Sequence, residues 1–313
     1  MTARAAGAYR EPAARNACPS GMTSPAQSLR FALILLWSVL AAALSGCMSM
    51  VGLGYGHADT VAAWKAGQYF DLDPDQERAF RTRFGDLYAW HRYEQLPEYV
   101  VFLRAGKQRL ERGLTPQDVE WFTGGLKARY RLVVQRGAAD AAELLATLTP
   151  QQIENLQRRW DKDNRKFAAE HRIDGTLEQR QRARAKRLLT QVRNWAGSLT
   201  AEQEARISAL VHALPDTERM RLEDRMRRQR EFVHLLDGRS GDRKEFTASL
   251  AHWLSDWERG RDREYARLSD AAWKQRVQLY VAVFHMLTHE QRSNVLQRLQ
   301  GHISEFRRLS QSS

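Results

Sequence analysis

Few residues of this 313-residue chain have the types and spacing that catalysis or metal binding requires, and Cys47 is the most conspicuous of them. The chain contains two cysteines, Cys18 and Cys47. A thiol can serve as a nucleophile, a metal ligand, a disulfide partner or an acylation site, and its surroundings decide which. Cys47 follows Leu44-Ser45-Gly46, directly after an apolar stretch from Phe31 to Ala43. This position indicates processing of the N-terminus rather than catalysis.

The apolar stretch has the layout of a secretory signal peptide, because Arg30 precedes it and small residues follow it. Its 13 residues would reach about 20 Å as a helix, short of the roughly 20 residues that a bilayer requires. We expect residues 1–46 to be a signal peptide that is removed on export. Residues 1–21 are long for its basic region, and Met22 would give a more ordinary signal. We suspect a start-site artefact there, and the choice between Met1 and Met22 stays open.

The run Leu44-Ser45-Gly46-Cys47 resembles the lipobox of bacterial lipoproteins. In that family the Cys thiol receives acyl chains such as palmitate, and the new terminal amine is acylated after cleavage. The resemblance implies that Cys47 is a lipidation site, and two or more acyl chains anchor a protein stably where one is marginal. Met48 and Ser49 follow, which in this family favours the periplasmic face of the outer membrane. Lipidation would also occupy the one thiol of the mature chain, which leaves none for a disulfide, a metal or a nucleophile.

The other candidate chemical groups are poorly placed. His285 and His289 are four residues apart, but a predicted helix start falls between them. Asp161 and Asp163, two apart on a helix, point in different directions. The glycines of residues 52–56 lack the lysine of a phosphate loop, and the chain has neither a His-Glu-x-x-His nor a Gly-x-Ser-x-Gly motif. We expect a non-enzymatic protein with no catalytic residue, no metal ligand and no cofactor.

The charge of the chain restricts its partners. Residues 47–313 carry a net charge of about +9, nearly all of the excess being arginine. A basic surface favours anionic partners such as lipid A phosphates, anionic lipid head groups or acidic proteins, and export disfavours nucleic acid. The alternative is a solvated surface of mixed charge. We expect a protein or an anionic envelope component as partner, and the oligomeric state stays open.

A recurrent pattern marks the expected helix starts: a leucine, then Asp or Thr, then Gln or Asp three residues further on. The Asp or Thr can accept a hydrogen bond from a free backbone N–H, and the residue three positions later can return one, which completes a capping box. Four copies end in Gln, which can return this hydrogen bond. The second copy ends in Asp118, whose shorter side chain is expected to return it only imperfectly. The leucines of the five copies are Leu72, Leu114, Leu148, Leu199 and Leu287.

The fold class expected from this pattern is all-α, an irregular bundle of about eight or nine helices between Asp59 and Leu309. Apolar residues recur with helical spacing between the starts, and hairpin signals are nearly absent. Helix ends are predicted at Gly113, Gly175, Gly197 and Gly238, with interruptions at Pro97 and Pro215. Residues 258–264 are charged all round, so they either bridge solvent within one helix or bend at Gly260. Residues 47–56 are expected to be a flexible tether, and residues 57–313 the helical domain.

The most distinctive block of the mature chain runs from Trp90 to Tyr99 and includes His91 and Gln95. Such a density of aromatic and polar residues is typical of a corner between helices. The alternative is a recognition surface, in which Trp90, His91, Gln95 and Tyr99 bind a partner.

This block, the preceding Asp71-Leu-Asp-Pro-Asp-Gln76 and the lipobox together resemble an uncharacterised family of proteobacterial helical lipoproteins that contains a domain of unknown function. More distantly, the Leu-Thr-x-x-Gln copies at Leu148, Leu199 and Leu287 look like those of the Spy-type periplasmic chaperones. The first resemblance implies an envelope location and an all-α fold, without an activity.

These expectations favour a lipoprotein that presents a basic, partner-binding helical domain to the periplasm, with a role in envelope assembly or maintenance. A Spy-like chaperone that binds unfolded clients is one alternative. An enzyme on a helical scaffold is the other, and the less favoured.

Overall fold

The computed structural model describes Tyr55 and residues 57–311, and the regular structure in that part of the chain is helical throughout, as predicted. Its elements are α3 (Ala58–Phe70), α4 (Pro74–Trp90), the π-helical segment η1 (His91–Gln95), α5 (Leu96–Glu111), α6 (Pro116–Leu145), α7 (Pro150–His171), α8 (Leu177–Ala196), α9 (Ala201–His212), α10 (Glu218–Asp237), α11 (Arg243–Ser255), α12 (Arg263–Met286) and α13 (His289–Gln311). Among the described residues, no helix combines the length and the apolar character that crossing a membrane requires. The predicted signal peptide and Cys47 lie outside the described residues.

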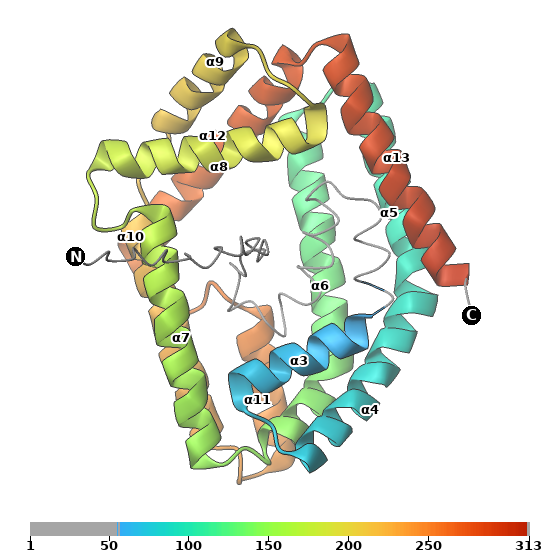
Figure 1. Cartoon of the computed structure of the whole chain (residues 1–313), viewed down its shortest axis with the longest axis vertical. Coiled ribbons are helices and arrows are strands. Elements are labelled where there is room, and N and C mark those ends of the chain that lie inside the picture. The colour runs from blue at the N-terminus through green and yellow to red at the C-terminus, as the bar shows by residue number, and fades with distance from the viewer. Residues whose placement is uncertain (1–54, 56, 312–313) are drawn as a thin grey trace, which may run out of the picture.

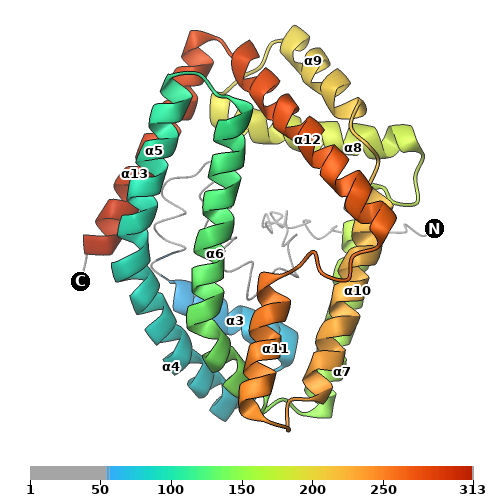
Figure 2. The same ribbon diagram turned by 180° about the vertical axis from the view of Figure 1, so that it is seen from behind.

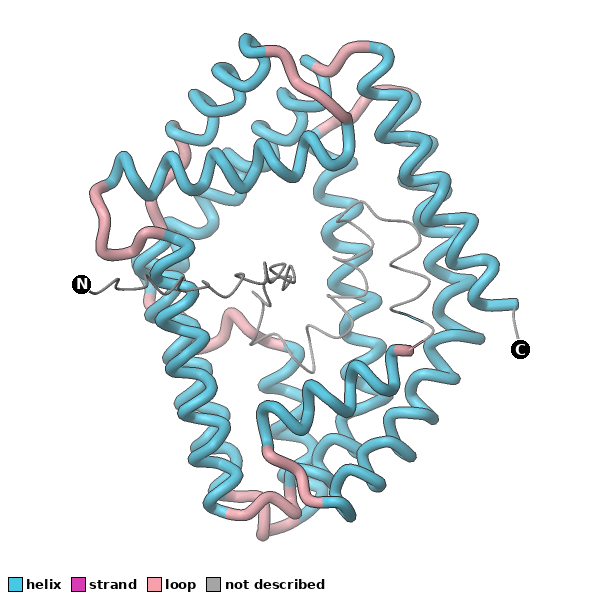
Figure 3. Tube along the Cα trace, in the orientation of Figure 1, coloured by secondary structure: helices cyan, strands magenta, loops and turns pink. Residues whose placement is uncertain are grey.

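The helices are arranged as a closed frame when the molecule is viewed down its shortest axis (Figure 1). α7 and α10 lie side by side along one long edge, and α4, α5 and α13 follow the opposite edge. α8, α9 and α12 cross one end, whereas α3 packs on both α4 and α7 near the other. Seen from behind, α6 lies between α5 and α11 (Figure 2). Short loops connect the helices at their ends (Figure 3).

The buried apolar side chains of the described residues form separate clusters at the junctions of this frame. One cluster, around Trp160, Phe232 and Leu250, joins helices α6, α7, α10 and α11. A second, around Leu96 and Phe306, joins α5 to α13, and others lie between α8, α9 and α12 and at the end of α12. Burial of a large apolar side chain contributes about 1.5–3 kcal/mol. The frame is therefore stabilised junction by junction.

The predicted capping boxes form at the helix starts. The four copies that end in Gln make both hydrogen bonds of the box, at the starts of α4, α7, α9 and α13. The Asp copy is complete as well, because the Asp118 carboxylate accepts from the backbone N–H of Thr115 at 3.0 Å. A further box, formed by Thr176 and Gln179, starts α8 and was not predicted.

The four glutamines also pair with each other across the frame. Gln76 and Gln152 exchange side-chain amide hydrogen bonds of 3.1 and 2.6 Å, and Gln203 and Gln291 do so at 2.8 and 2.9 Å. Each amide also donates to a backbone carbonyl two residues before the partner helix's N-cap: Thr147, Asp71, Met286 and Ser198, respectively. One pair ties the starts of α4 and α7, and the other ties the starts of α9 and α13.

Gly260 separates two helices, whereas Pro97 lies inside a helix that continues past it. Gly260 adopts a φ of +71°, between α11 and α12, so the charged segment is a break and not a continuous helix. Pro97, predicted to interrupt its helix, instead follows the wide turn of η1, and α5 continues through it. Proline lacks an N–H and clashes with the carbonyl four residues earlier, and a π turn relieves both problems. Pro215 does separate α9 from α10, as predicted.

Candidate functional site

The junction of α4, η1 and α5 gathers aromatic side chains around His91. We name Tyr55, Tyr88, His91 and Tyr99 the aromatic corner. The rings of Tyr55 and Tyr88 lie 4.9 Å apart between centroids, and those of His91 and Tyr99 lie 5.3 Å apart, edge to face. The π turn places His91 on the buried side of the chain, where it is 4% exposed.

Tyr55 joins the corner from the N-terminal side of α3. Its side chain is only 2% exposed, and its hydroxyl shares a hydrogen bond of 2.8 Å with Nδ1 of His91. The Tyr88 hydroxyl donates to the backbone carbonyl of Tyr55 at 2.9 Å. Both the side chain and the backbone of Tyr55 are thus fixed. Tyr55 is therefore packed against the helical domain, although the sequence predicts it within the flexible tether.

The aromatic corner favours uncharged groups. Burial lowers the pKa of His91 to about 4, so the imidazole is neutral at pH 7. Burial also raises the pKa of Tyr99 to about 12, and that of Tyr55 even further. Nε2 of His91 is buried without a hydrogen-bond partner. A neutral His–Tyr pair buried among aromatic rings is an arrangement typical of a structural junction.

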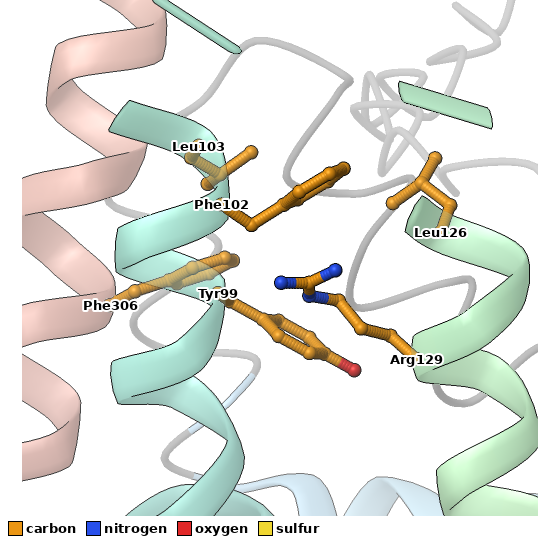
Figure 4. Close-up of a pocket in the computed structure, with 6 residues that line it drawn as sticks. All are labelled: Tyr99, Phe102, Leu103, Leu126, Arg129 and Phe306. Carbon is orange, nitrogen blue, oxygen red and sulfur yellow. The ribbon is translucent and has the colours of Figure 1, made fainter. Parts of the chain in front are cut away.

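A small hollow lies beside the aromatic corner and shares Tyr99 with it (Figure 4). Arg129 extends from α6 toward α5, with its guanidinium carbon 3.9 Å from the ring centroid of Phe102. Phe102 packs against α6 where Gly125 has no side chain, because a Cβ there would overlap its ring. The residues that line the hollow are Tyr99, Phe102, Leu103, Leu126, Arg129 and Phe306. Apolar walls with one cation and the phenol of Tyr99 can hold an apolar group or an anion, and no carboxylate or histidine lines the hollow.

A second buried polar group lies where α7, α8 and α10 meet. The Glu218 carboxylate accepts a hydrogen bond of 2.7 Å from Nδ1 of His171, and it lies 3.2 Å from Arg187 and 3.5 Å from Arg184. Burial alone would raise the pKa of Glu218, but His171 and the neighbouring arginines lower it to about 2. We name Glu218, His171, Arg184 and Arg187 the ion junction. Its charges connect three helices.

The four predicted partner-binding residues come together at one junction, but they differ in exposure. His91 and Tyr99 are buried in the apolar interior, whereas Trp90 and Gln95 are half-buried. The block lies within the unbroken helical run of α4, η1 and α5 and not at a turn between two helices, so the expected corner is wrong, and partner contact by these residues stays a prediction. Burial leaves only Trp90 and Gln95 of the four within reach of a partner. Cys47, the predicted lipidation site, lies outside the described residues.

The other candidates of the sequence take structural positions. Nε2 of His285 hydrogen-bonds the carbonyl of Leu114 at 2.9 Å. Asp163 is buried and accepts from the Tyr69 hydroxyl at 2.5 Å, whereas Asp161 is exposed, so the two carboxylates diverge as expected. Within the described residues, no three or more His, Cys, Asp and Glu side chains are grouped so as to hold a metal ion.

Sequence reasoning missed Tyr55, Arg129 and the ion junction. Their partners are distant in the chain, and the available signals were only isolated aromatic and charged residues. The pairing of the glutamines was missed for the same reason, although each copy of the motif was recognised.

Comparison with known proteins gives a family without a function. Residues 68–266 match the model of a family of unknown function, DUF6279. No curated protein and no solved structure matches the chain. The matched segment includes the aromatic block, both members of the first glutamine pair and the ion junction. With well over half of its residues matched, the chain belongs to the DUF6279 family.

Proposed function

We propose that this chain is a lipid-anchored, non-enzymatic protein whose helical domain binds a partner at the periplasmic face of the outer membrane. The observation that carries the proposal is the position of Cys47. It follows the apolar stretch after Leu44-Ser45-Gly46 and precedes Tyr55, which is packed against the helical domain, by eight residues. A signal, an acylation site and a short link to a folded domain therefore follow each other in the order that an anchored protein needs.

The use of the buried titratable groups supports a non-enzymatic role. Glu218 and His171 join α7 to α10, and Asp163 joins α7 to Tyr69 of α3. These groups contact other protein groups and line none of the hollow beside the aromatic corner. Perturbed titratable groups in a cleft would favour catalysis. Glu218, whose pKa is lowered, lies at a helix junction, and the groups with shifted pKa values that line the hollow, Tyr99 and Arg129, have no carboxylate or histidine beside them in its lining.

The charge supports a partner that is acidic or anionic. The mature chain is basic by about nine charges, and exposed arginines lie on most of its helices. Such a surface attracts an acidic protein or an anionic envelope component by long-range steering. A role in envelope assembly or maintenance is consistent with both kinds of partner.

Metabolic labelling with a clickable palmitate analogue tests the anchor. We expect labelling of the wild-type protein and of Cys18→Ser, because Cys18 lies in the segment that is removed. Cys47→Ser should lose the label and remain unprocessed. Equal labelling of Cys47→Ser and wild type would contradict the proposal.

Photo-crosslinking in intact cells then tests for a partner. We expect a discrete crosslinked species with the anchored protein and a much weaker one with Cys47→Ser. An activity on a small-molecule substrate that is lost on one polar substitution would instead support the enzyme alternative.

A chaperone-like role is the second candidate, favoured by large apolar side chains that are exposed among the arginines. Val101, Leu132 and Met226 are the examples on α5, α6 and α10. The Leu-Thr-x-x-Gln motif lends it less support, because its glutamines are engaged in capping and pairing. Suppression of client aggregation at substoichiometric amounts of the purified protein would support this role, and no suppression at any ratio would contradict it.

A further inference from the structure

We infer that the side of the frame formed by α3 and η1 faces the membrane, and that Trp64 and Tyr93 contact the interfacial region of a phospholipid bilayer. The inference rests on the proposed lipidation of Cys47. It adds an orientation and a lipid-contact surface, which the proposed function leaves open.

The first argument is the length of chain between the anchor and the fold. Eight Cα–Cα steps separate Cys47 from Tyr55, and a fully extended chain covers about 29 Å in that number of steps. α6 alone has 30 residues, which corresponds to about 45 Å of helix. Tyr55 is fixed by its side chain and backbone, so the bilayer surface must lie within about 29 Å of it. This distance is shorter than the helix α6, which lies along the frame. One side of the frame must therefore face the membrane.

The second argument is where the exposed apolar side chains lie. Val61, Trp64 and Tyr93 are three of the seven large apolar side chains exposed among the described residues. They fall on α3 and η1, which together have only 18 residues. α3 follows Tyr55 in the chain, and η1 contains its hydrogen-bond partner His91. The exposed apolar surface is thus concentrated on the elements next to the point where the tether enters.

The third argument is the chemistry of these side chains. Trp64 is 53% exposed and lies on the same face of α3 as Val61, three residues earlier. Nζ of Lys65 lies 4.8 Å from the Trp64 ring centroid, and the Arg92 guanidinium carbon lies 5.4 Å from that of Tyr93. Trp and Tyr are enriched at membrane interfaces because their rings are apolar with one polar group.

The charges of α3 and η1 favour a contact with lipid over a contact with an anionic protein. Asp59 and Glu94 offset Lys65 and Arg92, so α3 and η1 together are neutral. An anionic protein would find no net attraction there. Ring insertion into the bilayer interface does not need a net charge, and lipidation already holds the surface close to the bilayer.

Single thiols in the lipidated protein test the orientation. With Cys18 removed and Cys47 acylated, an introduced cysteine is the only free thiol of the mature chain. Trp64→Cys and Tyr93→Cys would carry an environment-sensitive fluorophore, in the full lipoprotein reconstituted into phosphatidylethanolamine–phosphatidylglycerol vesicles with brominated acyl chains. Leu177→Cys is the matched control, because Leu177 is 50% exposed at the start of α8, on the opposite edge of the frame from η1 (Figure 1).

We expect bromolipid quenching at positions 64 and 93 to exceed that at position 177 at least twofold. Equal quenching at the three positions, or stronger quenching at 177, would overturn the inference.

The melting temperature of each variant checks folding, which substitutions at half-exposed sites should preserve. Acylation of Cys47 is measured on the same samples by mass spectrometry. If Cys47 is acylated and quenching is uniform, the orientation is wrong and the anchor stands. An unmodified Cys47 overturns the anchor and, with it, the orientation.

Discussion

The aromatic corner and the ion junction are both built around a buried histidine, but they stabilise it in opposite ways. His91 shares its hydrogen bond with the Tyr55 hydroxyl, among aromatic rings and away from carboxylates. His171 bonds the Glu218 carboxylate, next to Arg184 and Arg187. Burial without a counter-charge keeps the first histidine neutral, whereas the second lies beside an ionised carboxylate.

The difference follows from what each junction connects. The aromatic corner holds Tyr55 against α4 and η1, and it can do so with apolar packing because Tyr55 brings a large ring. The ion junction connects α7, α8 and α10. His171 of α7 and Arg187 of α8 contact the Glu218 carboxylate. Arg184 of α8 lies between Glu218 and Asp216. The two junctions should therefore respond differently to substitution and to pH.

The largest expected effect is that of Glu218→Gln. Removing the carboxylate leaves Arg187 partly buried without its ion-pair partner, whereas Arg184 keeps Asp216 at 3.3 Å, and the loss of one member of a buried ion pair costs about 3–5 kcal/mol. For a domain of this size that corresponds to a fall in melting temperature on the order of 10 °C. Thermal and urea unfolding monitored by circular dichroism measure it. A change below about 1 kcal/mol would show that the junction contributes little.

Acid should destabilise the two junctions in different pH ranges. Burial lowers the pKa of His91 from 6.5 to about 4, so the unfolded chain takes up its proton first, and stability falls as the pH drops from 6.5 to 4. The pKa of Glu218 falls from 4.5 to about 2, so its contribution is lost between those values. Each of these two pKa shifts corresponds to about 3 kcal/mol of folding free energy.

Unfolding free energies of wild type and variants from pH 8 to 2 separate the two ranges. His91→Phe should flatten the slope from 6.5 to 4, with a smaller slope left by His302, whose pKa burial also lowers. Glu218→Gln should flatten the lower range. Parallel curves for wild type and His91→Phe would show that His91 does not titrate as proposed.

A smaller effect is expected from Tyr55→Phe. The ring and its contacts remain, and only the hydrogen bond to His91 is removed. Such a loss costs about 1 kcal/mol, and here it also leaves Nδ1 of His91 without its partner. Urea unfolding resolves a difference of this size. A loss above 3 kcal/mol would mean that the hydroxyl and not the ring holds Tyr55 in place.

The smallest effect is expected from Glu178→Gln, which removes an exposed ion pair with Arg182 on α8. Exposed pairs contribute about 0–1 kcal/mol because water and salt screen them. This variant is the control for Glu218→Gln, since both remove a carboxylate that contacts α8. Similar losses in the two variants would contradict the distinction between buried and exposed pairs.

Local signals in the sequence predicted the helix starts. The features that could not be predicted are those that depend on contacts between residues distant in the sequence. Each capping box spans four residues, so Thr149 and Gln152 suffice to predict the start of α7. The pairing of Gln152 with Gln76 depends on how α4 and α7 pack, which no local pattern contains. The burial of Tyr55 depends in the same way on Tyr88 and His91, which are distant from it in the sequence. The dense aromatic run at Trp90–Tyr99 marks a packed junction with α13, but the chain continues there as a helix and does not turn a corner.

The most direct test of the proposed function is intact mass spectrometry of the N-terminal peptide from the membrane-extracted protein. The proposal predicts a peptide that begins at Cys47 and carries a diacylglyceryl group and an N-linked acyl chain. A peptide that still contains Leu44-Ser45-Gly46, or an unmodified Cys47 at the N-terminus, would contradict it.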